Sequence, residues 1–116
     1  MFTKEEQVAG LEHQITGAKQ VIAHSEEVAQ LVQNPLFRKV ILEQFCTRDC
    51  ARYVQESGDP LLPEENRADA LALAQAAGHL RRWLDLAIRM GDNEKARLFD
   101  LQSELDIVRS EPEDEE

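Results

Sequence analysis

The sequence predicts an all-α protein: an elongated antiparallel three-helix bundle with a short fourth helix and an acidic C-terminal tail. Apolar residues recur at alternating spacings of three and four through most of the 116-residue chain, which is the period of a helix with one buried face. The four prolines stand between or after these periodic stretches, where helices end. Aromatic residues make up only 5% of the chain. A core of Leu, Val, Ile and Ala suits the packing of helix on helix.

The first helix is expected to begin at Thr3 and to end near residue 33. Thr3 and Glu6 have the spacing of a capping box, in which each side chain satisfies a free backbone N–H group of the other residue. An apolar seam follows, with the heptad spacing of helices that pack at a shallow left-handed angle. Its members are Val8, Leu11, Ile15, Ala18, Ile22, Ser25, Ala29 and Val32. Gly17 lies beside the seam and is expected to let a neighbouring helix approach closely.

The second helix is expected over residues 35–57. Asn34 is a good N-cap and Pro35 suits the first helical position, where its missing N–H group costs nothing. Ser57 and Gly58 end the helix before a rigid loop over residues 59–63. The apolar arc of this helix is wider than that of the first, which predicts packing on two sides.

The third helix begins near Pro63 or Glu64, and Gly91 is expected to end it. Its heptad seam consists of Ala70, Leu73, Ala77, Leu80, Leu84 and Ala87. A short fourth helix follows, capped by Asp92 or Asn93, with a stripe of Leu98, Leu101, Leu105 and Val108. The alternative is that Gly91 only kinks one long helix. Short connections should make neighbouring helices antiparallel. We expect one helical domain over residues 1–109 and a disordered acidic tail over residues 110–116.

The charge distribution is uneven. The formal net charge is −10, and residues 92–116 alone contain ten acidic residues against three basic ones. This balance disfavours direct binding of nucleic acid, because affinity for phosphate comes mainly from a positive face. The local exception is the run of Arg81, Arg82 and Trp83, which could form a small basic ridge beside an indole. The preferred interpretation is that Trp83 packs at the edge of the bundle and the arginines pair with neighbouring acids.

No catalytic, cofactor-binding or metal-binding residues are predicted. The sequence has no glycine-rich phosphate loop, no nucleophile elbow and no HExxH zinc motif. Cys46 and Cys50 are expected to be reduced and structural, because a pair four apart on a helix makes an unstrained disulfide difficult and lacks two further metal ligands. Metal or redox use of this pair is the alternative. A nucleophile–base pair of Cys50 with His79 is a remote one.

Two stretches, Asn34-Pro-Leu-Phe-Arg-Lys-Val-Ile-Leu-Glu43 and His79-Leu-Arg-Arg-Trp-Leu-Asp-Leu86, carry a resemblance to a known group. Residues 34–90 resemble small helical proteins from the head and tail gene clusters of tailed bacteriophages. The resemblance implies a helical hairpin that is a virion or assembly component. It implies no catalytic residues.

Together these features predict a non-enzymatic helical interaction protein that forms homo-oligomers or docks on a larger complex. The expected interface residues are the seam positions Leu11, Ile15, Ile22, Leu73, Leu80 and Leu84. The alternative is an acidic inhibitor that imitates nucleic acid at a basic site of a host protein. Its expected contact residues are Asp92, Glu94, Asp100, Glu104 and Asp106. The absence of a long apolar run or a signal-peptide pattern predicts a cytoplasmic protein without a membrane partner, in the host cytoplasm or the virion if phage-encoded.

Overall fold

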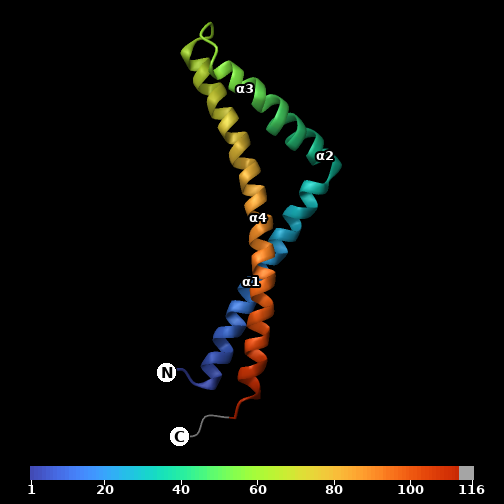
Figure 1. Ribbon diagram of the computed structural model, residues 1–116, viewed down its shortest axis with the longest axis vertical. Helices are drawn as coiled ribbons and strands as arrows, with labels where there is room; N and C mark the ends of the chain where they lie inside the picture. Colours follow the sequence, from blue (N-terminus) through green and yellow to red (C-terminus); the bar gives the residue numbers. More distant parts are fainter. Residues whose placement is uncertain (113–116) are drawn as a thin grey trace. The chain divides into compact units, whose positions relative to one another are not determined.

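The computed structural model describes residues 1–112, and every regular element in this range is helical (Figure 1). The elements are α1 (Lys4–Gln33), α2 (Pro35–Phe37), η1 (Arg38–Asp49), α3 (Cys50–Ser57) and α4 (Glu64–Ser110). The all-α prediction is therefore confirmed. Most of the predicted acidic tail, residues 113–116, lies outside the described residues.

The chain divides into two compact units. The terminal unit consists of residues 1–27 together with the chain from residue 87 onward, and the central unit consists of residues 28–86. Both α1 and α4 contribute to each unit. The predicted three-helix bundle with a short fourth helix is not confirmed, because the helices that the structure describes in the terminal unit are parts of α1 and α4 only.

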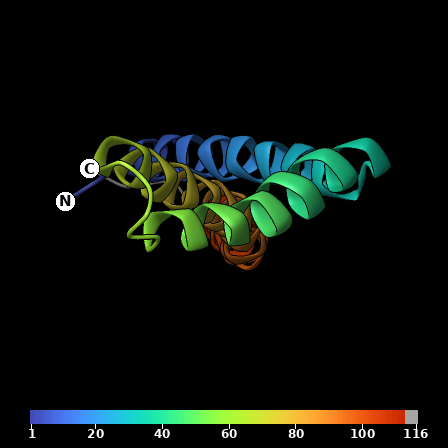
Figure 2. The ribbon, with the colours of Figure 1, turned by 90° about the horizontal axis from the view of Figure 1, so that it is seen from above.

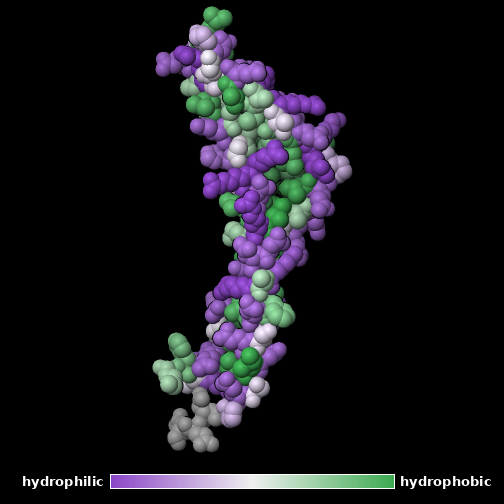
Figure 3. All heavy atoms as spheres, viewed as in Figure 1, coloured by the Kyte–Doolittle hydropathy of each residue, from purple (hydrophilic) through white to green (hydrophobic). Residues whose placement is uncertain are grey.

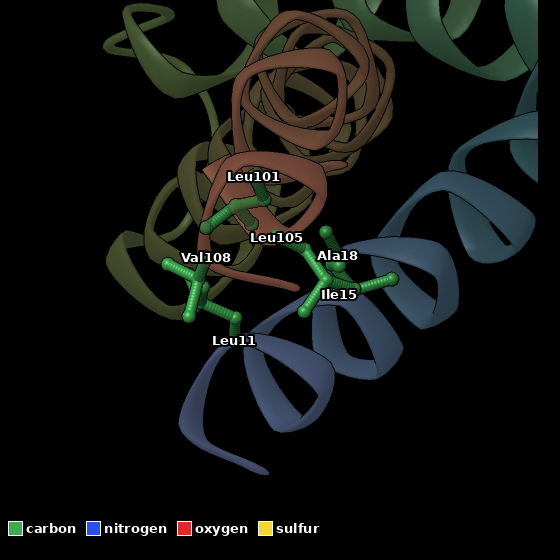
Figure 4. Close-up of a cluster of buried hydrophobic side chains, with 6 residues drawn as sticks. All are labelled: Leu11, Ile15, Ala18, Leu101, Leu105 and Val108. Carbon is green, nitrogen blue, oxygen red and sulfur yellow. The ribbon is translucent and has the colours of Figure 1, made fainter. Parts of the chain in front are cut away.

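In the terminal unit, α1 and α4 pack along the seams that their spacing predicts. Six buried side chains form one cluster (Figure 4): Leu11, Ile15 and Ala18 from α1, and Leu101, Leu105 and Val108 from α4. Burying a Leu or Ile side chain contributes about 1.5–3 kcal/mol, so this cluster supplies much of the unit's stability. Val8 and Leu98 pack against the cluster and are partly buried.

Polar contacts show that the two helices of the terminal unit run antiparallel. Lys4 Nζ donates to the backbone carbonyl oxygens of Arg109 (3.2 Å) and Glu111 (2.6 Å), so the start of α1 lies beside the end of α4. Ser25 Oγ donates to the carbonyl oxygen of Ile88 at 3.4 Å. These contacts place residue 4 near residue 110 and residue 25 near residue 88.

The expected end of a helix at Gly91 is wrong, and α4 continues through this residue to Ser110. No glycine in the described chain has the positive φ angle that would mark a C-terminal cap. A Cβ atom built on Gly91 would lie 1.9 Å from Ser25 Oγ and 2.2 Å from Ser25 Cβ. Gly91 therefore lies directly against Ser25 of α1, with no room for a side chain. The expectation for Gly17 is not met within the chain, because no atom lies within 4 Å of a Cβ atom built there.

In the central unit, η1 and α3 lie against the first part of α4. Cys46 Sγ donates to the carbonyl oxygen of Ala77 at 3.8 Å, and Cys50 Sγ donates to that of Ala74 at 3.7 Å. Ala70, Ala74 and Ala77 are all buried, so small side chains on α4 bring its backbone within reach of the thiols. Leu84 is the largest buried side chain that α4 adds in this unit.

The second predicted helix has the predicted ends but a different interior. Asn34 Oδ1 accepts from the backbone N–H groups of Leu36 and Phe37, and α3 ends at Ser57, which confirms both boundaries. Figure 2 shows α2, η1 and α3 as one unbroken helical path. Its middle part, η1, is a π-helix, which the sequence does not predict. π-helical segments this long are rare.

Contacts between residues five apart identify the π-helical geometry of η1. The backbone N–H of Cys50 donates to the carbonyl oxygen of Phe45. Thr47 Oγ1 donates to the carbonyl oxygen of Leu42 at 2.8 Å, and Gln44 Nε2 donates to Asp49 Oδ1 at 2.8 Å. Because each turn closes on the fifth residue rather than the fourth, side chains are distributed around η1 differently than around an α-helix.

Candidate interaction surfaces

The predicted seam residues are occupied by contacts within the chain. Leu11, Ile15 and Leu84 are buried, with exposed fractions of 7%, 8% and 3%. Ile22, Leu73 and Leu80 are half-buried. A role of these six residues between separate chains stays a prediction.

The face of α4 that points away from α1 in the terminal unit carries exposed apolar side chains. Phe99 is 71% exposed and Ile107 is 61% exposed. Both lie about half a turn away from the buried positions Leu101, Leu105 and Val108, as the 3.6-residue period requires. The small residues Ala96 and Ser103, also exposed, lie on the same face. They leave room for another backbone to approach. We call this surface the α4 outer face.

Three of the five predicted acidic contact residues belong to the α4 outer face. Asp92, Asp100 and Asp106 are exposed and flank Phe99 and Ile107 on the helix surface. The other two lie elsewhere: Glu94 is a half-buried seam position paired with Arg97 at 3.2 Å, and Glu104 lies on the flank of the helix. The five acids therefore do not form a single row.

Two of the three basic residues in this part of α4 are directed toward α1. Arg97 donates to Gln14 Oε1 at 3.1 Å as well as to Glu94, and Arg109 pairs with Glu12 at 2.6 Å. These contacts place the positive charges of Arg97 and Arg109 on the side of α4 that faces α1. The third basic residue, Lys95, is exposed at the edge of the α4 outer face, three residues after Asp92 and four before Phe99. This face therefore combines apolar side chains with mostly acidic ones.

A second periodic set of residues in the sequence indicates the α4 outer face. Asp92, Ala96, Phe99, Ser103 and Asp106 repeat at spacings of four, three, four and three. This second periodic set lies opposite the first and mixes acids with a large apolar residue. Phe99 and Ile107 were not among the predicted interface residues.

The central unit carries a surface of opposite charge on η1. Arg38, Lys39 and Arg48 line an open depression of about 560 Å³. Val40 also lines it and is 49% exposed, and Leu36, which is 68% exposed, lies four residues before Val40. The one acidic residue at this depression is Glu43. We call this set of residues the η1 surface. Figure 3 shows that apolar residues reach the molecular surface among hydrophilic ones.

The π-helical geometry brings the basic residues of the η1 surface together. Lys39 and Arg48 are nine residues apart, which is about 2.5 turns of an α-helix and would place them on opposite sides. A π-helix uses more residues for each turn, so nine residues make close to two full turns. Both side chains consequently line the same depression.

The two cysteines are free thiols held against α4. Burial raises the pKa of the Cys46 thiol, and Cys50 raises it further, while the positive charge of Arg81 opposes both effects. A raised pKa keeps the thiol protonated at neutral pH and makes it a poor nucleophile. Within residues 1–112, no group of three or more His, Cys, Asp or Glu side chains is placed to hold a metal ion.

The run of Arg81, Arg82 and Trp83 lies in the central unit on α4. Arg81 and Arg82 are both exposed, and Trp83 is 53% exposed. Arg81 is also close enough to Cys46 to lower the pKa of its thiol. Leu86 follows Trp83 by three residues and is 41% exposed. This part of α4 therefore presents an indole beside two exposed arginines, and the basic ridge stays a prediction.

Comparison with protein-family models, with curated proteins and with solved structures found no match. In the part of the chain that the structure describes, no helix combines the length and the apolar character that crossing a bilayer requires.

Proposed function

We propose that this chain is a non-enzymatic interaction protein that docks a helix of a protein partner on the α4 outer face. The observation that carries the proposal is the exposure of Phe99 and Ile107 on a face that the chain's own seam leaves uncovered. Large apolar side chains grouped on a surface, with polar residues around them, are typical of a protein interface.

The chemistry of this face defines the partner. A partner helix that packs on Phe99 and Ile107 needs apolar side chains. It also needs lysines or arginines beside them to pair with Asp92, Asp100 and Asp106. An amphipathic helix with an apolar stripe and basic flanks satisfies both requirements. An assembly role, including one in a phage particle, is compatible with such docking and stays a prediction.

A second candidate function is the acidic inhibitor, favoured by the shared exposure of Asp92, Asp100 and Asp106 on one face. In that case the carboxylates would supply most of the affinity by imitating phosphate charge at a basic site. The apolar side chains would then contribute little. The two functions therefore make opposite predictions for substitutions of the acids and of the apolar residues.

The test uses two synthetic helical peptides with the same leucine stripe, one flanked by lysines and one by glutamates. The intact chain should bind the lysine peptide and not the glutamate peptide, measured by fluorescence anisotropy. Phe99→Ala and Ile107→Ala should each weaken binding about tenfold, because truncating a central apolar contact typically costs more than 1 kcal/mol. The matched control is Leu61→Ala, which removes a side chain that is 91% exposed in the 58–63 turn and should leave binding unchanged.

The acidic residues distinguish the two candidates. Under helix docking, Asp92→Asn, Asp100→Asn and Asp106→Asn together should slow association and weaken binding modestly, and the remaining affinity should resist salt. Complete loss of binding on this change, with no effect of Phe99→Ala or Ile107→Ala, would favour the acidic inhibitor. Failure of the intact chain to bind the lysine peptide would contradict helix docking.

A further inference from the structure

We infer that the partner helix is η1 of a second copy of this chain, seated on the α4 outer face of the first. This inference rests on the proposed function, because it names the occupant of that face. The required partner has apolar side chains beside basic ones. The η1 surface has this chemistry, with Val40 exposed beside Arg38, Lys39 and Arg48, and Leu36 exposed four residues before Val40.

The two surfaces are complementary in charge. Asp92, Asp100 and Asp106, with Lys95 at the edge, give the α4 outer face a formal charge of −3 + 1 = −2. On the η1 surface, three basic residues and Glu43 give 3 − 1 = +2. Complementary charges of this kind guide association and fix the register of the two surfaces. The exposed apolar side chains on each side then supply the area that leaves water.

The same charges oppose contacts between like surfaces. Two α4 outer faces placed together would bring Asp92, Asp100 and Asp106 of one copy against those of the other, and two η1 surfaces would oppose arginines and lysines. Juxtaposed like charges cost several kcal/mol. The contact must therefore join unlike surfaces, either once, as a heterologous interface, or twice and reciprocally, in a two-fold dimer.

A heterologous interface leaves each bound copy with one unused surface. The η1 surface of the first copy and the α4 outer face of the second stay exposed after the first contact forms. Further copies can add by the same contact, producing a closed ring or an open filament according to the rotation between copies. The η1 surface exists in this form because the π-helix places Lys39 and Arg48 on one side, so assembly depends on this local geometry.

The test is the solution mass of the intact chain, measured by light scattering on a size-exclusion column over a range of protein and salt concentrations. The mass should rise with protein concentration and fall as salt is added. Two reversed variants are then compared. Asp100→Lys with Asp106→Lys makes the α4 outer face basic, and Arg38→Glu with Arg48→Glu makes the η1 surface acidic. Each variant alone should be monomeric, with its dissociation constant raised at least about 100-fold.

Mixing the two reversed variants provides the decisive measurement. The basic α4 outer face of one variant now matches the acidic η1 surface of the other, and the unaltered surfaces also match, so the mixture should assemble again. Matched controls carry the same charge changes at exposed positions elsewhere: Glu26→Lys with Glu27→Lys, and Arg82→Glu with Arg89→Glu. Both controls should assemble alone, and circular dichroism should show that all four variants keep their helix content.

Failure of this inference differs from failure of the proposed function. A native chain that stays monomeric at all concentrations, yet binds the lysine peptide through Phe99 and Ile107, would overturn the second-copy partner and leave helix docking intact. A mixture of reversed variants that stays monomeric would overturn the inference as well. Dissolution of the native assembly by the lysine peptide would support it, because the peptide and η1 would compete for one face.

Discussion

Ser25 on α1 and Gly91 on α4 lie against each other in the terminal unit. Ser25 is 5% exposed, and its hydroxyl donates to the carbonyl oxygen of Ile88 on the same helix as Gly91. A side chain at residue 91 would overlap both Oγ and Cβ of Ser25. Rotation of the serine side chain cannot relieve the second overlap, since Cβ is fixed to the backbone. The absence of a side chain at residue 91 therefore sets the distance between the helices.

Gly91→Ala should destabilise the protein although Ala favours helix more than Gly. The gain in helix propensity is about 1 kcal/mol, whereas forcing extra volume into a packed contact costs about 1–3 kcal/mol and here requires the backbones to separate. Gly17→Ala is the matched control, with no atom within 4 Å of the added Cβ, and should stabilise by about 0.5–1 kcal/mol. Chemical denaturation of the three proteins measures these differences.

Ser25→Gly added to Gly91→Ala should recover part of the lost stability, because it removes the atoms that the new methyl group meets. A Gly91→Ala protein that is as stable as the Gly17→Ala protein would contradict the close approach. The role of Gly91 could have been read from the sequence by register. Ala87, Gly91, Glu94 and Leu98 continue the spacing of four, three and four that joins the two stripes of α4. The residue type suggested a helix end, but the unbroken heptad period indicated one helix.

At the scale of the element, the ends of the helical segment that contains η1 can be predicted from the sequence, whereas its π-helical interior cannot. Asn34, Pro35 and Ser57 act through their own backbone and capping chemistry, so the ends of this helical segment are predictable from local residues. The π-helical turns between these ends depend on hydrogen bonds between residues five apart, and residues 38–49 contain no Pro or Gly to mark them. The η1 surface was consequently missed, because an α-helical projection separates Lys39 from Arg48.

The hydrogen bonding of η1 can be measured directly by NMR through the scalar coupling across a hydrogen bond. The backbone N–H of Cys50 should couple to the carbonyl carbon of Phe45, five residues earlier, since the π-helical bond joins these residues. Coupling to Cys46, four residues earlier, would instead mean an ordinary α-helix and would remove the geometric basis of the η1 surface. The same experiment on α4 gives an internal control, because its bonds should all join residues four apart.

At the scale of the whole molecule, the acidic residues that we propose to bind a partner also repel one another in the folded chain and lower its stability. The formal net charge of −10 causes repulsion within the folded chain, and much of it is concentrated between residues 92 and 116. Asp92, Asp100 and Asp106 add to this repulsion without a compensating contact to α1, whereas Glu12 pairs with Arg109. Their position on an exposed apolar face is explained if they recognise a basic partner rather than stabilise the fold.

Replacing Asp92, Asp100 and Asp106 together by Asn should therefore raise the melting temperature by a few degrees at low salt while reducing partner binding. Asp and Asn have similar helix propensities, so the change in charge dominates the result. The difference should disappear at high salt, where the repulsion is screened in both proteins. Glu26→Gln with Glu27→Gln is the comparison, because it also reduces net charge but lies away from the α4 outer face. It should raise the melting temperature without affecting assembly or peptide binding.

A lower melting temperature for the aspartate variant at low salt would mean that these carboxylates stabilise the fold, and their exposure beside Phe99 and Ile107 would then need no partner to explain it.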